Sequence, residues 1–307
     1  MWEVLIEPFG FALDPAKRIY WGCLLSALVL ASAFVSVRER TFDPRAQLSR
    51  FMNRRYWINA STAQDVGWLF ANNAIKGLVL LPIIGSHLAL TLVVGGQLQT
   101  QLGDAPDLEF PLWLIAGTYT ASYFVLEDLS RFLLHMAMHR NSWLWKLHRI
   151  HHSAKVLTPL TLFRVHPIEQ ALYFFRGVIV FGLVSGIFIW LFGRELSAWD
   201  ILGVDLFGFA FNALGANLRH SHIPLGFGHF ERWIISPRQH QLHHSVDHGH
   251  CNLGVCLAAW DRIAGTAVSM KLAEPLRFGL NEDVVPEGSD SSYSAISENA
   301  PAWARST

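Results

Sequence analysis

Histidine residues crowd two short segments of this 307-residue chain. The segment LHRIHHS (147–153) and the segment QHQLHHS (239–245) both contain the pattern His-x-x-His-His-Ser. A third segment, HMAMH, places His135 and His139 four residues apart. Because residues three and four apart share one side of a helix, each segment can direct two or three imidazoles toward one point. The spacing therefore predicts metal binding.

The candidate ligands are too many for one metal ion. A single zinc ion takes three or four protein ligands, so this set predicts two ions. Imidazole suits iron, zinc or copper, and the spacing does not choose among them. The chain has no H-E-x-x-H motif, which argues against metal-dependent peptide hydrolysis. The set consists of His135, His139, His148, His151, His152, His240, His243 and His244, with His220 as a ninth member.

Three further histidines have other interpretations. His222 follows His220 by two residues, and it is either a tenth ligand or a polar residue at the surface. His87 and His229 each stand alone. A lone histidine is more often an ordinary polar residue than a ligand, so we leave both outside the ligand set.

Composition indicates a membrane protein. Hydrophobic residues make up 51% of the chain and charged residues only 16%, which is apolar for a soluble protein of this length. The formal net charge is zero, so no basic field favours nucleic acid as a partner. Three isolated cysteines show neither a C-x-x-C pair nor the spacing of a disulfide framework, as expected for free thiols in a reducing compartment.

Several apolar runs approach the roughly 20 residues that a helix needs to cross a bilayer. The fourth run (Gln170–Phe192) contains Arg176. The fifth run (Ile201–Leu218) contains Asp205 and is a weaker candidate for a membrane span. We therefore predict an all-α integral membrane protein with a bundle of four to five transmembrane helices; the alternative is that some runs are core helices of a large soluble domain. The runs are Ile19–Val37, Gly77–Val94, Pro111–Val125, Gln170–Phe192 and Ile201–Leu218.

Loop charges predict the orientation of these runs, because basic loops stay on the cytoplasmic side. Six arginines lie between the first and second runs, whereas the loop between the second and third runs holds Asp104, Asp107 and Glu109 and no basic residue. The segment after the third run is again basic. This topology places every histidine cluster on the cytoplasmic side, in a His-rich helical cap.

The order of several motifs resembles one known family. The segments HMAMH, LWKLHRIHHS, FRVHPIE, RHSHIPL, SPRQHQLHHS, CNLG and AAWDRIAGT are similar to those of the fatty acid hydroxylase and sterol desaturase superfamily of integral membrane oxidases. The resemblance extends from about Asp128 to Leu280. It implies a membrane helix bundle capped by a cytosolic helical domain that holds a di-metal centre, physiologically di-iron, which activates O2. Zinc is a possible occupant in a purified sample.

The resemblance also implies roles for single residues. The nine histidines of the ligand set match metal ligands of the family. Asp128 matches an acidic residue of the family, and we expect it to accept a hydrogen bond from a ligand imidazole. His166 in HPIE is expected to be structural or to support a ligand. Two departures limit the match: Met136 stands where relatives usually have Arg, and His222 where they often have Asn.

The expected activity is hydroxylation of a lipid or another hydrophobic substrate, with desaturation or ether cleavage as alternatives on the same site. Electrons must come from outside, from a ferredoxin or cytochrome with its reductase, because no Rossmann fingerprint or haem-binding box is present. Two other classes remain: a membrane metal transporter, and a lipid-binding relative with structural zinc. Transport would need ionisable residues along the spans, which hold few.

Three regions divide the chain in this interpretation. Residues 1–127 comprise the first membrane spans and a basic cytosolic loop. Residues 128–280 form the catalytic domain, which includes two further membrane helices. Residues 281–307 are rich in Ser, Glu, Asp and Pro and are expected to be a flexible tail. The expected location is a bacterial inner membrane with the metal site on the cytoplasmic side.

Overall fold

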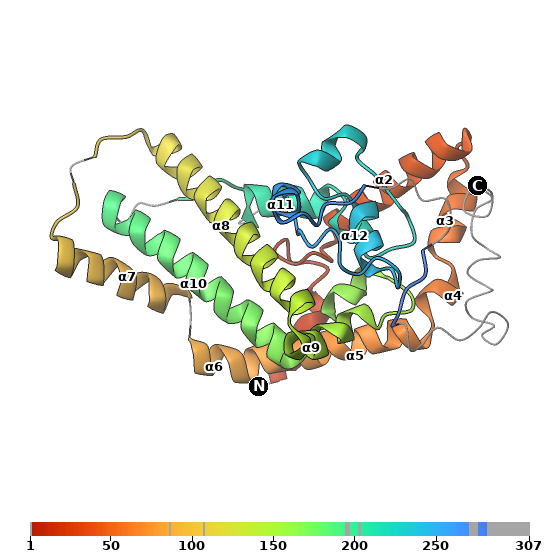
Figure 1. The fold of residues 1–307 in the computed structure, drawn as a ribbon, viewed down its shortest axis with the longest axis horizontal. Coiled ribbons are helices and arrows are strands. Elements are labelled where there is room, and N and C mark those ends of the chain that lie inside the picture. The colour runs from red at the N-terminus through yellow and green to blue at the C-terminus, as the bar shows by residue number, and fades with distance from the viewer. Residues whose placement is uncertain are drawn as a thin grey trace.

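The computed structural model describes residues 2–85, 87–106, 108–193, 197–201, 204–269 and 276–280, so the predicted tail lies outside the described residues. Helices dominate the described part, and a short antiparallel pair of strands is the small exception to the all-α prediction (Figure 1). The elements are α1 (Trp2–Ile6), η1 (Glu7–Gly10), α2 (Trp21–Glu39), α3 (Pro44–Phe51), α4 (Arg54–Trp57), α5 (Ala60–Ile75), η2 (Lys76–Leu80), α6 (Leu81–Ile84), α7 (His87–Leu102), α8 (Leu112–Arg140), α9 (Ser142–His152), η3 (Pro159–Phe163), α10 (Pro167–Phe192), β1 (Asp200–Ile201), β2 (Val204–Asp205), α11 (Leu206–Ala213), η4 (Ala216–Leu218), η5 (Gly228–Arg232), α12 (Pro237–His244) and α13 (Ala259–Ala264).

Three helical segments of the described chain are long and apolar enough to cross a membrane, namely Trp21–Glu39, Ala60–Leu102 and Pro167–Phe192. The second of these is interrupted where Gly85 has a φ of +81°, inside the predicted run Gly77–Val94. The third predicted run lies in the first half of α8, which is less apolar because Glu127 and Asp128 follow it closely. The chain is therefore a helical membrane protein.

The fifth predicted run, Ile201–Leu218, does not form a spanning helix. It is divided between the strand pair, the helix α11 of eight residues and the short turn η4. The Asp205 carboxylate accepts a hydrogen bond from the Gly208 amide at 2.7 Å and so begins α11 at that point. Gly215, with a φ of +101°, follows the helix end. A helix of this length rises only about 12 Å, too little to cross a bilayer.

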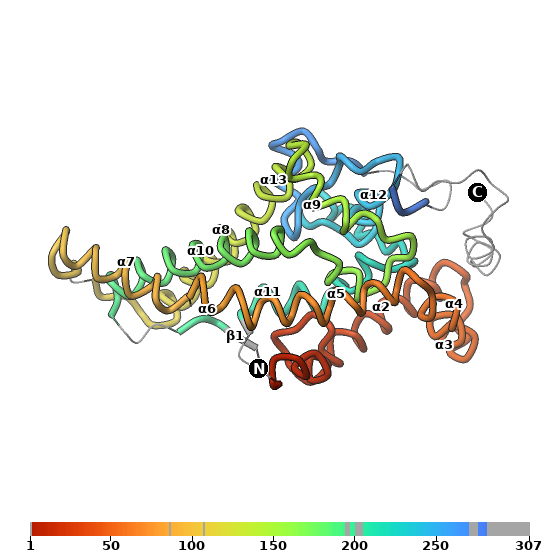
Figure 2. Tube along the Cα trace, turned by 90° about the horizontal axis from the view of Figure 1, so that it is seen from below, coloured from red at the N-terminus to blue at the C-terminus, as the bar shows by residue number. Residues whose placement is uncertain are grey.

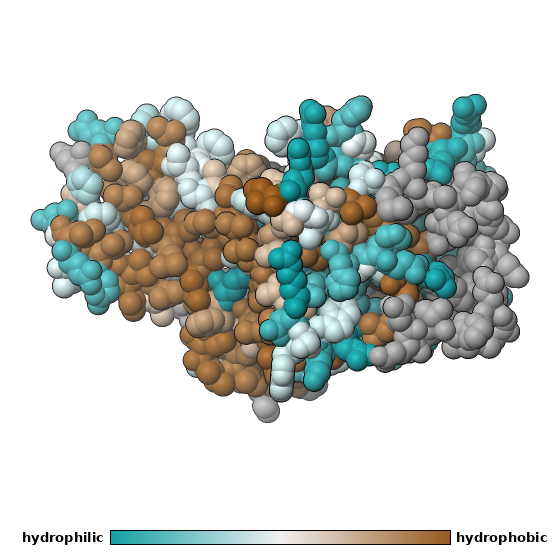
Figure 3. Space-filling model, viewed as in Figure 1, coloured by the Kyte–Doolittle hydropathy of each residue, from teal (hydrophilic) through white to brown (hydrophobic). Residues whose placement is uncertain are grey.

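The helices α7, α8 and α10 lie together at one end of the molecule (Figures 1 and 2). Apolar side chains cover this end, whereas hydrophilic ones gather toward the end that carries α9 and α12 (Figure 3). Gly182 and Gly186 form a G-x-x-x-G pair on α10 that lets α7 approach closely. A Cβ atom at Gly186 would lie 2.6 Å from the Val94 Cβ atom, and one at Gly182 would lie 2.6 Å from the Leu90 Cγ atom.

An ion pair joins α8 and α10 between the apolar end and the rest of the molecule. The guanidinium of Arg176 donates two hydrogen bonds to the Glu127 carboxylate, at 2.7 and 2.8 Å. It also donates to the Ser130 hydroxyl at 2.6 Å, and Arg131 donates to Glu127 at 2.8 Å. This cluster accounts for the arginine in the fourth apolar run, because the charge is matched by an acidic partner.

Capping residues fix the ends of the helices that carry the histidines. The Asn141 side chain accepts hydrogen bonds from the Trp143 and Leu144 amides and begins α9. Ser236 begins α12 in a capping box, with Pro237 at the first helical position. These caps set the rotation of each helix about its axis, and hence the direction in which the imidazoles point.

Candidate metal centre

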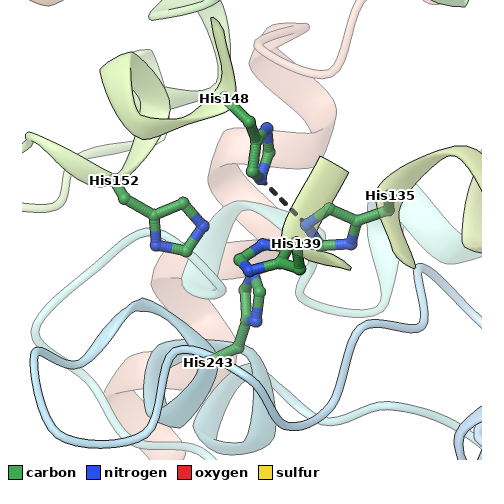
Figure 4. A group of neighbouring side chains, drawn as sticks. All are labelled: His135, His139, His148, His152 and His243. Carbon is green, nitrogen blue, oxygen red and sulfur yellow. Dashed lines mark hydrogen bonds between the residues drawn. The ribbon is translucent and has the colours of Figure 1, made fainter. Parts of the chain in front are cut away.

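The structure brings nine of the ten predicted ligands into two adjoining clusters. Within each cluster one candidate ligand atom per residue lies within 4.8 Å of those of the other members, and every member is buried. Figure 4 shows the five-His cluster, in which the rings point toward one another. This five-His cluster consists of His135, His139, His148, His152 and His243, and the four-His cluster consists of His151, His220, His240 and His244.

Helix geometry divides the histidine boxes between the two clusters. The pairs His148/His152 and His240/His244 are four residues apart, so the two rings of each pair face one cluster. The remaining member of each box, His151 or His243, is turned toward the other cluster. Each of these two boxes therefore directs two of its three imidazoles at one point, within the expectation of two or three, and the third ring points elsewhere because positions i, i+3 and i+4 span about 100° around the helix axis.

The two clusters share a boundary. The rings of His152 and His244, which belong to different clusters, are stacked with their centroids 4.5 Å apart. His151 and His152 are adjacent in sequence, as are His243 and His244, and each pair contributes one ring to each cluster. Neighbouring residues of α9 and α12 thus place the two candidate ion positions side by side.

The facing imidazole nitrogens of the two clusters fit a metal cation between them better than they fit protons. The Nε2 atoms of His135 and His148 are 3.0 Å apart, and those of His220 and His244 are 3.1 Å apart. Two protonated rings cannot face each other at this separation, because both nitrogens would be donors. Burial lowers the pKa of His135 and His148 to about 3, and that of His244 well below its ordinary value.

Orphaned nitrogens give a second indication of metal binding. Both ring nitrogens of His139, the Nε2 atoms of His152 and His243 and the Nδ1 atom of His244 are buried without a hydrogen-bond partner. Leaving a buried polar atom without a partner costs about 1–3 kcal/mol. A coordinated ion in each cluster would remove this cost for the nitrogens that face it.

Four acceptors fix the ring orientation by taking a hydrogen bond from the nitrogen on the far side of the ring. His148 donates from Nδ1 to the Glu169 carboxylate at 2.7 Å. Backbone carbonyls serve the others: Leu253 accepts from His135 at 2.6 Å, Cys251 from His243 at 2.9 Å, and Arg164 from His151 at 3.2 Å. A proton on Nδ1 leaves the Nε2 lone pair directed into the cluster, as metal coordination requires.

Asp128 acts on a backbone segment, which corrects the expectation that it holds a ligand imidazole. Its carboxylate accepts from the Cys256 amide, the Leu257 amide and the Trp260 indole, each at 2.9 Å. Asp261 accepts from the Leu253 and Gly254 amides at 2.7 Å in the same segment. Because the Leu253 carbonyl holds His135, these two carboxylates position that ring through the backbone. This is the structural role of the WDRIAGT motif.

The other singled-out histidines lie outside both clusters. His222 is exposed, and its ring packs edge-on against Tyr56 at 4.5 Å, so the surface interpretation matches its position. His166 begins α10 by accepting a hydrogen bond from the Ile168 amide at 3.1 Å, in keeping with a structural role. A histidine outside the predicted ligand set, His250, is exposed, and its ring lies 5.9 Å from that of His139.

The part of the chain that carries this geometry matches a known family. Residues 120–266 match the family model described as fatty acid hydroxylase, and they include all nine clustered histidines. This part of the chain belongs to the fatty acid hydroxylase family. The resemblance to the fatty acid hydroxylase and sterol desaturase superfamily is thereby confirmed.

Curated relatives share about half of their length with this chain. Methylsterol monooxygenase 1 of Gallus gallus is 26% identical over 184 residues, which are 58% of this chain and 56% of that protein. A putative methylsterol monooxygenase of Dictyostelium discoideum is 29% identical over 154 residues, which are 48% of this chain and 49% of that protein. No solved structure matches.

Sequence reasoning missed three buried charged residues that support the fatty acid hydroxylase domain. Glu169 stands in the HPIE segment, where the histidine drew attention instead. Arg164, whose carbonyl holds His151, donates from Nε to the Asp65 carboxylate at 2.7 Å, and both side chains are buried. Asp65 lies in α5, outside the matched family region. The signal that identifies Asp65 is its burial as the partner of an oppositely charged residue. The sequence alone does not show which two charged residues pair.

Proposed function

We propose that this protein is a membrane-bound di-iron oxygenase that uses O2 and external electrons to hydroxylate a hydrophobic, sterol-like substrate. The observation that carries the proposal is the pair of adjoining clusters of buried, neutral imidazoles. Two ions side by side can share the electrons that are needed to activate one O2 molecule. The match to the fatty acid hydroxylase family supports it.

In this proposal the five-His cluster holds one iron ion and the four-His cluster holds the other. The bound metals would supply the oxidant that breaks an unactivated C–H bond. Imidazole also binds zinc, so a purified sample can contain zinc at the same positions. The structure supports the donor set and its burial, and metal analysis of the purified protein identifies the ion.

The chain's own residues orient the ligands and keep water away. Glu169 and the carbonyls of Leu253, Cys251 and Arg164 each hold one ligand ring in a fixed orientation. Burial of all nine rings excludes bulk water, which protects a reactive oxidant from reduction by side reactions. The overall reaction consumes a C–H bond, O2, two electrons and two protons, and yields the alcohol and one water molecule.

The substrate class follows from the apolar end of the molecule and from the relatives' names. Two curated relatives carry the name methylsterol monooxygenase, one of them as putative, which favours a sterol-like lipid over a soluble metabolite. We propose that such a lipid reaches the cap from the bilayer. We also propose that the cap faces the cytoplasm, as the basic loops predict, and that the protein lies in a bacterial inner membrane. The electron donor is a separate ferredoxin or cytochrome.

Isotope labelling tests this function directly. The purified protein, loaded with iron in lipid nanodiscs and supplied with a sterol-containing lipid extract, is reduced chemically and exposed to ¹⁸O2. Mass spectrometry is expected to show a lipid heavier by one ¹⁸O atom, absent when His151→Ala replaces the wild type and retained with the matched surface change His222→Ala. A product lighter by two hydrogens would indicate desaturation instead. Full iron loading with no O2 consumption would refute an oxidase function.

A further inference from the structure

We propose that the exposed basic face at the junction of α8 and α9 is the docking site for a small, acidic, one-electron carrier protein. The face is formed by Arg140 at the end of α8 and by Trp143 and Lys146 of α9. This inference rests on the proposed function, since only an oxygenase with an external donor needs such a site. It adds the place of electron entry and the charge of the partner.

The chemistry of the face favours an acidic protein. No Asp or Glu occurs between residues 129 and 168, whereas this stretch contains six Lys or Arg residues. Arg140 and Lys146 are exposed, and Trp143 is 76% exposed. The Lys146 ammonium lies over the Trp143 ring, 5.1 Å from its centroid. Exposed tryptophan and arginine are typical of protein interfaces, and the lysine adds a positive charge that attracts an acidic partner.

One aromatic residue connects this face with the five-His cluster. Trp145, between Trp143 and Lys146 in sequence, is partly buried, and its ring centroid lies 5.2 Å from that of His139 and 5.4 Å from that of His152. An electron that arrives at the face therefore passes through a single indole ring to reach two candidate ligands. Contacts between conjugated rings at this separation favour rapid electron transfer over a path through bulk protein.

The face is also well placed for a partner from the aqueous side. The Glu127–Arg176 ion pair follows the apolar first half of α8 directly in sequence. From Glu127 the helix α8 continues to Arg140, which is about 20 Å at 1.5 Å per residue. The face thus lies at the C-terminal end of α8, where α9 follows, away from α7 (Figure 1). Asp247 is an acidic residue that follows the third histidine box in sequence, and it forms an ion pair with Arg277.

Each docking event transfers one electron. The reduced carrier is oxidised and the protein is reduced by one unit, so two encounters supply the two electrons of one turnover. Together with two protons, these electrons convert one oxygen atom of O2 to water while the other enters the substrate C–H bond. The carrier is thus the reductant, and no further co-reactant is required.

Anaerobic stopped-flow kinetics tests the docking site. A reduced [2Fe–2S] ferredoxin of negative net charge is mixed with the oxidised, iron-loaded protein in nanodiscs, and the rate of ferredoxin oxidation is recorded at several salt concentrations. Lys146→Glu is expected to slow this rate about tenfold at low salt and to remove most of its salt dependence, because steering by opposite charge is lost. Arg45→Glu, the same charge change on the exposed face of α3, is the matched control and is expected to leave the rate unchanged.

Chemical reduction separates this inference from the proposed function. With dithionite as reductant, Lys146→Glu should bind as much iron and form as much product as the wild type. Two results would refute the docking site and leave the oxygenase intact, provided that dithionite supports product formation. One is an equal ferredoxin oxidation rate in Lys146→Glu and the wild type, and the other is failure of the ferredoxin to reduce the wild type. If brominated lipids quench Trp143 fluorescence, measured against Trp143→Phe, the face contacts the bilayer and the inference is likewise wrong. Absence of product with both reductants refutes the oxygenase itself.

Discussion

At the residue scale, each clustered imidazole has two nitrogens with separate tasks. One nitrogen faces the cluster, and the other, where it has a partner in the protein, meets an acceptor that fixes the ring. His240 differs, because its Nδ1 atom meets the Arg219 guanidinium, a donor, at 3.0 Å. Burial lowers the pKa of Arg219 to about 10, which still leaves this group charged at neutral pH. His240 therefore differs from the other clustered rings, since a neutral ring that accepts at Nδ1 carries its proton on Nε2, and that proton must leave before Nε2 can bind a metal.

Glu169 is expected to strengthen metal binding through His148. Glu169→Gln keeps the shape of the side chain but removes the charge that accepts the His148 Nδ1 proton, so affinity for one of the two ions should fall about 10-fold to 100-fold. Metal retained after dialysis against increasing chelator concentrations measures this change. Glu3→Gln, at an exposed position, is the control. Equal retention in both variants would show that the Glu169 contact does not support the metal.

The metal-free protein is expected to lose stability in acid. Burial lowers the pKa of His135, His148 and His151 to about 3, whereas an unfolded histidine has a pKa of about 6.5. Below pH 6.5 the unfolded state therefore binds more protons than the folded state, so stability is full above this pH and falls toward pH 3. Each ring contributes up to about 1.4 kcal/mol per pH unit in this range. Thermal melting in detergent at pH 7.5 and 5.5 measures the effect, and equal melting temperatures would contradict it.

The clustered histidines could be found from the sequence because their spacing repeats, but their hydrogen-bond partners could not. Nine of the ten predicted side chains meet in the clusters. The acceptors are mostly backbone carbonyls, such as those of Leu253 and Arg164, and a carbonyl has no residue type that could reveal it. Asp128 was noticed, yet its true contacts are backbone amides that only the folded loop brings to it.

At the element scale, short capped helices do the positioning and long apolar ones provide the scaffold. The boundaries of α9 and α12 follow local signals, Asn141 in one case and Ser236 with Pro237 in the other. Apolar composition was a poorer guide, because Ile201–Leu218 is apolar enough to suggest a span but is divided by Asp205 and Gly215. Hydropathy reports what a segment can bury, whereas capping residues decide where its helix begins and ends.

The contact between α7 and α10 depends on glycine. Gly186→Leu would place a Cβ atom 2.6 Å from that of Val94, so the helices must separate, at a cost of about 1–3 kcal/mol. Gly177→Leu on the same helix is the matched control, since a Cβ atom at Gly177 meets no other atom within 4 Å. Thermal melting of both variants in detergent should show a lower melting temperature for Gly186→Leu alone. A loss of the same size in Gly177→Leu would mean that the close approach of α7 does not set the effect, because leucine has the higher helix propensity and should not by itself destabilise α10.

At the scale of the whole molecule, an apolar helical end is joined to a hydrophilic cap that contains the histidine clusters (Figure 3). The family match covers the cap and the helices α8 and α10 that lead into it, whereas Asp65 reaches the site from the preceding part of the chain. Residues distant in sequence, from α5 to α13, thus converge on the two histidine clusters. This architecture fits the proposed oxygenase, because the histidine clusters lie next to, but outside, the apolar end.

Metal stoichiometry tests the central claim most directly. Elemental analysis of the purified, iron-loaded protein is expected to give close to two ions per chain, all bound to nitrogen by X-ray absorption. His152→Ala in the five-His cluster and His244→Ala in the four-His cluster should each lose about one ion, while His222→Ala keeps both. One ion or fewer in the wild type, or as large a loss in His222→Ala as in His152→Ala, would contradict a two-ion centre built from these nine imidazoles.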